Sequence, residues 1–401
     1  MNIMTTPAHR IGESLVRVVD KNGNPVADKE LVLNQKSHQF LFGSGAFDFV
    51  DWTGKGLDQA RTAMWLDLLN YGTLPFYWGE YERKEGEIEF ESRMNAAKIL
   101  RANNVTLKGH PLCWHTVCAD WLMDYPDEVI MDKQLARINR EVTAFKGVID
   151  IWDVINEVVI MPVFDKYDNA VTRLCKRYGR VELVKEVFAA AKAANPDGMF
   201  LINDFNTTPK YEELIEQCLD AGIGISAIGI QSHQHQGYWG TEKLYDVLKR
   251  FSRFGLPIHF TENTLVSGSL IPEYIEDLND WQVTDWPTTI AGEERQAKEW
   301  EEMYRILFAD PNIKAITGWD FADGAWLNAP SGLVTADNRC KPAYNKLLSL
   351  VKGEWWTKDQ VIRTNSEGIV SVKGTKGTYE INGAEGVITL GDEPSNATVI
   401  L

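Results

Sequence analysis

The sequence predicts an α/β fold, a closed (β/α)8 TIM barrel that carries a small accessory β-unit formed by the two ends of the chain. Short apolar runs rich in β-branched residues alternate with amphipathic stretches across residues 40–352, the order expected of parallel strands and covering helices. At both ends of the chain, apolar and polar residues alternate with the two-residue period of half-buried strands. A doubly wound open sheet is the alternative, but no glycine-rich phosphate loop follows the first predicted strand.

The chain is expected to divide into three parts, residues 1–39, 40–352 and 353–401. In the first part, segments 14–19 and 30–33 flank Asn22-Gly23-Asn24-Pro25, a strong turn signal, and are expected to form a β-hairpin. The last part contains glycine-separated strand candidates at 368–372, 378–381 and 386–390. Because an isolated hairpin is only marginally stable, we expect the two ends of the chain to pair into one small β-unit.

The central part contains eight strand candidates separated by helical stretches. The chain has 401 residues, enough for a barrel of ~250 residues or more and an additional small unit. The predicted strands are residues 40–45, 70–73, 106–110, 148–155, 200–203, 227–231, 258–261 and 315–319. The predicted helices include residues 57–69, 132–143, 180–194, 210–219, 242–254 and 293–308.

Composition and charge narrow the possible partners. The formal net charge of −16 disfavours nucleic acid and anionic membrane surfaces. No apolar run reaches the ~18 residues of a membrane span or has the form of a signal peptide, so we expect a soluble protein, either intracellular or secreted after loss of a leader. The five cysteines are an odd number without zinc-site spacing and are expected to be reduced thiols. No metal or cofactor is expected, and the oligomeric state is not predicted.

Two of the predicted strands end in glutamate. Glu157 follows the run from Ile151 to Asn156, and Glu262 follows the run from Pro257 to Thr261. A buried carboxylate is costly unless it has a partner or a function, and glycoside hydrolysis requires a pair of carboxyl groups. The alternative interpretation is that each glutamate is an exposed strand end or half of a structural ion pair.

Other polar and aromatic residues follow the ends of neighbouring strands, which meet at the mouth of such a barrel. They are His110, Trp114, His115, Asn156, Gln231, His233, Trp319 and Trp326. In a retaining glycosidase, the Asn156 amide could hold a sugar hydroxyl, and His233 could keep Glu262 ionised. Gln231 and His110 offer further hydrogen-bond donors. A lone histidine is more often structural, but clusters at six successive strand ends favour one site.

Five motifs in order resemble glycoside hydrolase family 10, the endo-1,4-β-xylanase family, over about residues 40–351. They are segments 109–115, 152–157, 203–206, 231–233 and 261–262. The resemblance implies a retaining hydrolase that cleaves β-1,4-xylosidic bonds in a polysaccharide or oligosaccharide through a covalent glycosyl-enzyme. It implies Glu157 as acid/base and Glu262 as nucleophile. The other residues that it assigns to the sugar site are His110, Trp114, Asn156, Gln231 and His233, with Trp319 and Trp326 as an aromatic lid.

The sequence departs from the family pattern at four places. The nucleophile motif usually continues Glu-Leu-Asp but is Glu262-Asn263-Thr264 here, and the stretch from Trp319 to Trp326 is slightly shorter than usual. After its second strand the family usually has Glu-Asn-x-Met-Lys-Trp, which grips a glycone sugar, whereas this chain has Leu74-Pro75-Phe76-Tyr77-Trp78. Residues 266–291 are a long insertion containing Trp281 and Trp286. Xylan is therefore the first expected substrate, and a substituted xylan or another β-linked glycan is the alternative.

Two other classes of protein are considered. A metal-dependent barrel hydrolase would use His110, His115, His233 and His235, but those enzymes typically carry a His-x-His after the first strand, where this chain has Gly43-Ser44-Gly45. A non-catalytic glycan-binding protein on the same fold would normally lack one of the two carboxylates, and both are present.

Overall fold

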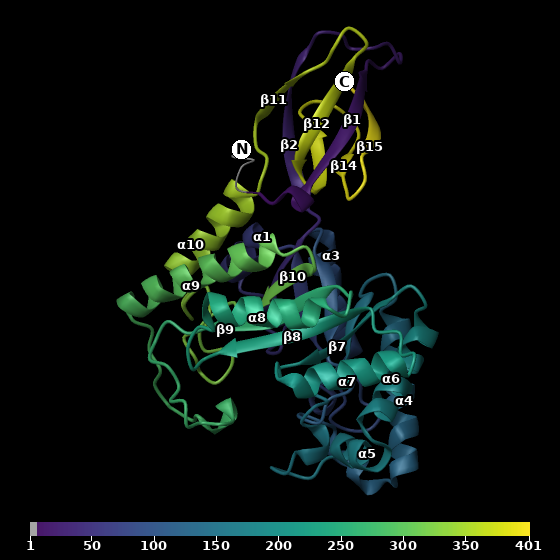
Figure 1. The fold of residues 1–401 in the computed structure, drawn as a ribbon, viewed down its shortest axis with the longest axis vertical. Coiled ribbons are helices and arrows are strands. Elements are labelled where there is room, and N and C mark those ends of the chain that lie inside the picture. Colours follow the sequence, from purple (N-terminus) through teal and green to yellow (C-terminus); the bar gives the residue numbers. More distant parts are fainter. Residues whose placement is uncertain (1–5) are drawn as a thin grey trace.

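The computed structural model describes residues 6–401, and its centre is a closed barrel of eight parallel strands (Figure 1). The strands follow the order β10-β3-β4-β5-β6-β7-β8-β9 around the barrel, and helices lie between successive strands. This confirms the predicted (β/α)8 TIM barrel. The strands are β3 (Leu41–Gly45), β4 (Tyr71–Pro75), β5 (Thr106–His110), β6 (Ile151–Asn156), β7 (Met199–Asp204), β8 (Ala227–Gln234), β9 (Ile258–Leu265) and β10 (Ile313–Gly318).

Ten α-helices lie in the described residues 6–401, most of them between successive barrel strands. They are α1 (Gln59–Leu68), α2 (Trp78–Tyr81), α3 (Phe90–Ala102), α4 (Asp127–Ala144), α5 (Ala170–Tyr178), α6 (Arg180–Ala194), α7 (Pro209–Asp220), α8 (Gly240–Ser252), α9 (Ile290–Ala309) and α10 (Pro342–Ser349). Several begin at a capping side chain: Asn169 accepts from Thr172 N–H, and Thr289 accepts from Gly292 N–H. None of these helices is long and apolar enough to cross a membrane.

Four helices were not among those predicted: α2, α3, α5 and α10. In α3 the reason is visible, because the charged Arg93 lies on the buried face and interrupts the apolar pattern. Arg93 Nε donates to the carbonyl oxygen of Pro75 at 3.1 Å. Only the folded structure supplies that acceptor.

The accessory β-unit consists of two sheets, each combining strands from both ends of the chain. One sheet has the order β12-β1-β15 and the other β11-β2-β13-β14. The strands are β1 (Ile11–Val19), β2 (Glu30–His38), β11 (Gln360–Arg363), β12 (Ile369–Thr375), β13 (Gly377–Ile381), β14 (Ile388–Leu390) and β15 (Ser395–Ile400). Apolar residues from both sheets, among them Val16, Leu33, Val372 and Tyr379, form a core separate from that of the barrel.

The predicted N-terminal hairpin is wrong, because β1 and β2 lie in different sheets. β1 pairs with β12 and β15, whereas β2 pairs with β11 and β13. Each strand has one apolar face, and a two-stranded hairpin would leave that face in water. Two facing sheets bury both faces, so pairing with distant strands outweighs the local turn signal.

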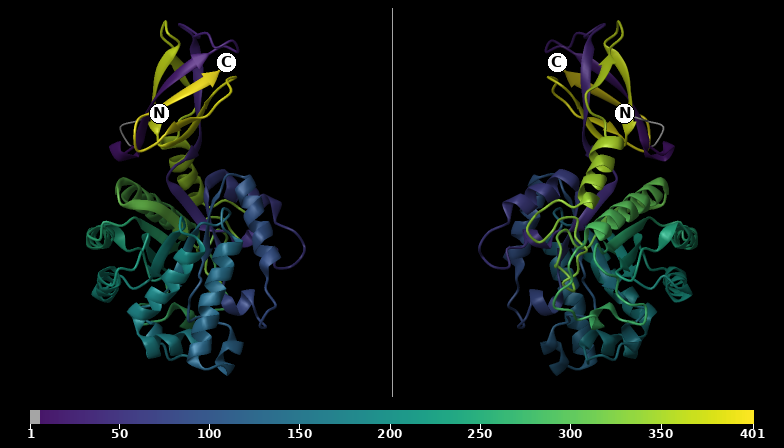
Figure 2. Two further views of the ribbon diagram at one scale, coloured as in Figure 1. Left: turned by 90° about the vertical axis from the view of Figure 1, so that its right-hand side faces the viewer. Right: turned by 90° about the vertical axis from the view of Figure 1, so that its left-hand side faces the viewer.

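The β-unit projects from one end of the molecule (Figures 1 and 2), and its contacts with the barrel lie at the amino ends of barrel strands. Its strand β2 leads directly into the amino end of β3. The buried Arg10 guanidinium donates to the carbonyl oxygens of Phe308, Asp310 and Ile313, at the amino end of β10. The β-unit is therefore attached to the barrel far from the strand ends that carry the candidate site. The boundaries at residues 39 and 352 stay a prediction.

The remaining described elements are short helical turns, and the five cysteines are free thiols. The turns are η1 (Ala8–Arg10), η2 (Phe47–Phe49), η3 (Asp120–Asp124), η4 (Met161–Val163), η5 (Leu278–Asp280) and the π-helical η6 (Leu350–Glu354). The segment between β9 and α9, residues 266–289, carries η5 and has a small apolar core of its own, formed by Val266, Ile271 and Trp286 with Ala329.

Candidate active site

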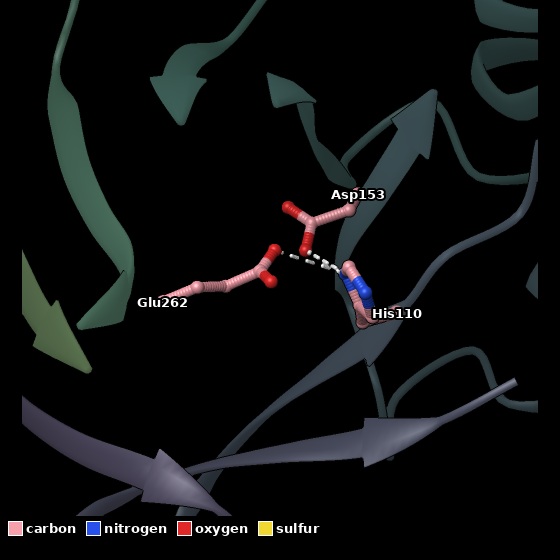
Figure 3. Close-up of side chains that lie close together, drawn as sticks. All are labelled: His110, Asp153 and Glu262. Carbon is pink, nitrogen blue, oxygen red and sulfur yellow. Dashed lines mark hydrogen bonds and ion pairs between the residues drawn. The ribbon is translucent and has the colours of Figure 1, made fainter. Parts of the chain in front are cut away.

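A buried ion-pair network lies below the mouth of the barrel. Lys108 on β5 and Asp153 on β6 are fully buried, with 2.6 Å between Nζ and Oδ2. His110 Nδ1 is 2.7 Å from the same oxygen, and Figure 3 shows dashed lines from His110 to both Asp153 and Glu262. Although burial alone would raise the pKa of Asp153, Lys108 and His110 hold that pKa below its usual value. This network orients the His110 ring toward the site.

Glu262 on β9 has an environment that favours its ionised form. Asn203 Nδ2 donates to its Oε1 at 2.7 Å, and His233 Nε2 is 3.2 Å from its Oε2. His110 Nδ1 is 3.8 Å from Oε1. Burial opposes ionisation, but His110, His233 and Lys108 together hold the pKa of Glu262 below its usual value. Glu262 is therefore a carboxylate at neutral pH.

Glu157 immediately follows β6 and has the opposite electrostatic character. Burial and the neighbouring charge of Glu262 raise the pKa of Glu157 to about 8, so the protonated form predominates at neutral pH. Trp114 Nε1 donates to Oε2 at 2.9 Å, and Gln231 Nε2 donates to Oε1 at 3.3 Å. The backbone φ of Glu157 is 57°, a left-handed conformation that is costly for a residue other than glycine and is often found at functional sites.

Amide side chains connect the two glutamates. Asn156 Oδ1 accepts from Asn203 Nδ2 at 2.8 Å and from Gln231 Nε2 at 3.0 Å, which determines the orientation of the Asn156 amide. Within residues 6–401 nothing accepts from the buried Asn156 Nδ2, so this donor is available to a ligand. Gly229 on β8 makes room for this arrangement, because a Cβ there would lie 2.3 Å from Asn203 Oδ1.

Aromatic rings surround the glutamates. Trp319 packs against His110 and His233, with ring centroids 5.1 and 6.0 Å apart. Trp326 packs against His233 at 4.6 Å. Trp114 packs against Tyr77 at 5.5 Å. All nine predicted site residues therefore lie together at the carboxyl end of the barrel, while their roles stay a prediction.

The sequence analysis did not include five further residues in the site: Lys108, Asp153, Asn203, Thr261 and Tyr77. Asn203 and Thr261 stood in motifs, but nothing in the sequence distinguished an amide that joins two carboxyl groups from an ordinary polar strand end. Lys108 and Asp153 each interrupt an apolar strand, and a charged residue inside such a run is the signal that could have identified them. Tyr77 lies near both glutamates, and burial followed by the charge of Glu262 raises its pKa well above the usual value.

His110, Asp153 and Glu262 also have the donor types of a metal site, with ligand atoms within 4.8 Å of one another. Lys108 Nζ, however, lies 2.6 Å from the same Asp153 oxygen that His110 contacts. A second cation there would be repelled by the ammonium group, so the three residues fit an internal hydrogen-bonded network better than a metal site. Among residues 6–401 no other group of three ligand residues has its ligand atoms within that distance.

A (β/α)8 barrel with two carboxyl groups in opposite electrostatic states at its mouth has the features of a glycoside hydrolase. The sequence model of Glycosyl hydrolase family 10 matches residues 76–350, and the chain belongs to this family. Family membership confirms the predicted resemblance and the predicted enzyme class.

Individual relatives are distant. An endo-1,4-beta-xylanase/feruloyl esterase of Xylanibacter ruminicola is 25% identical over 326 residues, 71% of this chain and 42% of that protein. Endo-1,4-beta-xylanase A of the same species is 27% identical over 288 residues, 63% of this chain and 75% of that protein. A solved structure of GH10 from Paenibacillus barcinonensis is 21% identical with a TM-score of 0.65, covering 78% of this chain and 96% of that one, and this likeness shows the fold.

Proposed function

We propose that this protein is a retaining glycoside hydrolase that cleaves β-1,4-xylosidic bonds in xylan or xylo-oligosaccharides. Glu157 is the acid/base and Glu262 is the nucleophile. The observation that carries the proposal is the opposite state of the two carboxyl groups: the pKa of Glu157 is raised to about 8, and that of Glu262 lies below its usual value. A pair of carboxyl groups pushed apart in this way supplies one acid and one nucleophile at the same pH.

In the first step, a Glu262 oxygen attacks the anomeric carbon while Glu157 gives its proton to the departing glycosidic oxygen. The products are a covalent glycosyl-enzyme and a free sugar hydroxyl, and Glu157 is left as a carboxylate. The unpaired Asn156 Nδ2 donates to a hydroxyl of the reacting sugar as positive charge develops on the ring. Trp114 and Gln231 hold Glu157 in position through the hydrogen bonds to its two oxygens.

In the second step, the Glu157 carboxylate takes a proton from water, and the resulting nucleophile attacks the anomeric carbon. The bond to Glu262 breaks, and Glu262 returns to the carboxylate form. Two inversions at the same carbon give net retention of configuration. Asn203, His110 and His233 favour the carboxylate as a leaving group because each supports its negative charge.

The aromatic rings of Trp319, Trp326 and Tyr77 provide apolar faces on which sugar rings can stack. Xylan is the proposed substrate because two relatives are described as endo-1,4-beta-xylanases. Residues 74–78 lack the polar clamp usual in the family, which favours a substituted xylan over an unsubstituted one.

Proton NMR of xylohexaose hydrolysis tests the proposal. The expected first product is the β-anomer, which converts to the equilibrium mixture by mutarotation. An initial α-anomer would exclude double displacement. A parallel screen with gluco- and manno-oligosaccharides of the same length identifies the glycan. Binding without turnover on every substrate would instead favour the glycan-binding alternative.

A further inference from the structure

The loops that follow Glu157 and Glu262 meet above the barrel. Lys166 lies in the loop between β6 and α5, and Asp277 and Asp280 lie in the loop between β9 and α9. Lys166 Nζ is 2.5 Å from Asp277 Oδ2 and 2.7 Å from Asp280 Oδ1. In the barrel, β6 and β9 are separated by β7 and β8. The ion pairs therefore connect two loops across the side of the mouth that β7 and β8 form.

The loops of β7 and β8 are short by comparison. β7 ends at Asp204 and α7 begins at Pro209, while β8 ends at Gln234 and α8 begins at Gly240. The longer loops after β6 and β9 consequently extend beyond them, and Figure 1 shows the segment after β9 as a long excursion from the barrel. The connection through Lys166 therefore links the two longer loops beside the short loops of β7 and β8.

Both ends of the connection are held by further contacts. Gln236 Nε2 donates to the carbonyl oxygens of Pro272 and Ile275, and Trp286 packs in the small core of the same segment. On the other side, the Phe164 ring packs against His115 and Tyr167 at centroid distances of 4.5 and 4.9 Å. The two loops are therefore ordered walls, and Lys166 joins them.

We propose that the ion pairs of Lys166 with Asp277 and Asp280 close the mouth at its β7–β8 side and limit the number of sugar units bound there. This inference rests on the proposed function. Glu157 protonates the leaving oxygen and begins the loop that carries Lys166, so the closed side is the side toward which the leaving group extends. The substrate class is then short xylo-oligosaccharides or chain ends, cut near the reducing end.

The test compares the full chain with Lys166→Ala and Lys166→Glu. Lys185→Ala is the matched control, since it removes an exposed ion pair with Glu182 on α6, at 3.1 Å. Cleavage positions are measured on xylohexaose labelled with ¹⁸O at its reducing end, and an aryl β-xylobioside measures the chemistry with a small leaving group. The wild type is expected to cut mainly near the labelled end.

Lys166→Ala should shift cleavage toward internal bonds by about threefold, a factor typical of an exposed ion pair. Lys166→Glu should shift it further because it repels both aspartates, and Lys185→Ala should have no effect. Raising NaCl to about 1 M should move the wild type in the same direction through screening. Random internal cleavage by the wild type, or an unchanged pattern in Lys166→Glu, would overturn the proposal.

A binding measurement tests the closure of the mouth independently of the proposed catalytic reaction. In the Glu262→Ala background, calorimetry with xylo-oligosaccharides of increasing length should show affinity levelling off at short chains. With Lys166→Glu added, affinity should keep rising with length. Equal length dependence in the two proteins would reject the closure. Failure of the wild type on the aryl xylobioside counts against the proposed function, while the binding comparison still decides whether the mouth is closed.

Discussion

Asn203 donates to Glu262 Oε1 at 2.7 Å, and the same amide nitrogen donates to Asn156 Oδ1 at 2.8 Å. Thr261 Oγ1 donates to Asn203 Oδ1 at 2.6 Å, so hydrogen bonds to both the oxygen and the nitrogen of the Asn203 amide fix its orientation. A donor held in this way supports the negative charge of Glu262. It also turns the Asn156 amide so that its nitrogen is left for substrate.

Replacing Glu262 by alanine should lower turnover by about 10⁴-fold or more, because no covalent intermediate can form. Azide or formate should restore part of the rate and give a product of inverted configuration. The measurement is kcat on an aryl β-xylobioside with and without the added anion. A variant that keeps a substantial share of the wild-type rate would remove Glu262 from the role of nucleophile.

Replacing Glu157 by alanine should affect poor leaving groups far more than good ones. Natural glycosidic oxygens need a full proton transfer, whose loss costs roughly 10²–10⁴-fold, whereas dinitrophenolate leaves almost unaided. Because the pKa of Glu157 is raised to about 8, the wild-type activity should fall above that pH, and the variant should lose this alkaline limb. Equal losses on both kinds of substrate would contradict the assignment.

The same raised pKa predicts a pH-dependent stability. Between the usual value of 4.5 and about 8, the unfolded chain releases the Glu157 proton while the folded protein keeps it, so the free energy of unfolding falls as pH rises. Below pH 4.5 Glu157 is protonated in both the folded and the unfolded protein, so its ionisation does not lower the free energy of unfolding there. Urea unfolding should show that the free energy of unfolding of Glu157→Gln rises relative to that of the wild type between pH 4.5 and 8, by an amount on the order of a few kcal/mol. The control is Glu213→Gln, on an exposed face of α7, and a parallel change in the control would defeat the prediction.

The apolar segment at residues 74–78 predicts slow turnover of unsubstituted xylan. Missing hydrogen bonds to a glycone sugar, each contributing roughly 0.5–1.5 kcal/mol, should weaken binding of a plain chain, while stacking on Tyr77 favours a substituted one. The ratio of kcat/KM on substituted and unsubstituted xylo-oligosaccharides measures this. Tyr77→Lys, which restores the residue usual in the family, should lower the ratio, and Tyr77→Phe is its control. Rapid internal cleavage of plain xylohexaose by the wild type would be the opposite result.

The attachment of the β-unit predicts a large stability effect at Arg10. Removing its guanidinium leaves the carbonyl oxygens of Phe308, Asp310 and Ile313 without their buried donor. Arg10→Ala should therefore lower the free energy of unfolding by about 3 kcal/mol. Arg17→Ala, at an exposed position of β1, should change it little. Thermal unfolding of both variants checks the difference, and similar losses would show that Arg10 is not a specific anchor.

The periodicity of the sequence predicted the barrel because each buried strand and each covering helix has its own local hydrophobic pattern. The hydrophobic pattern did not predict the structure where residues distant in the sequence determine the burial of a side chain or the pairing of a strand. Arg93 lies on the buried face of α3 because Pro75 supplies an acceptor. β1 and β2 lie in different sheets because strands from the other end of the chain cover their apolar faces.

The sequence by itself identified the two glutamates as a pair, because the motifs around them are local. The predicted strand end at Glu262 is wrong, however: Glu157 directly follows β6, whereas β9 continues past Glu262 to Leu265. The tertiary structure alone supplied the charges and donors that set the protonation states of the two carboxyl groups. A pKa depends on charges and donors within a few ångströms, and Glu262 receives His233 from β8 and Asn203 from β7, whereas Glu157 receives the neutral donors Trp114 and Gln231. The ion pair of Lys166 with Asp277 likewise depends on the tertiary structure, which brings together the loops after β6 and β9. No local pattern in a sequence specifies which distant charges will meet.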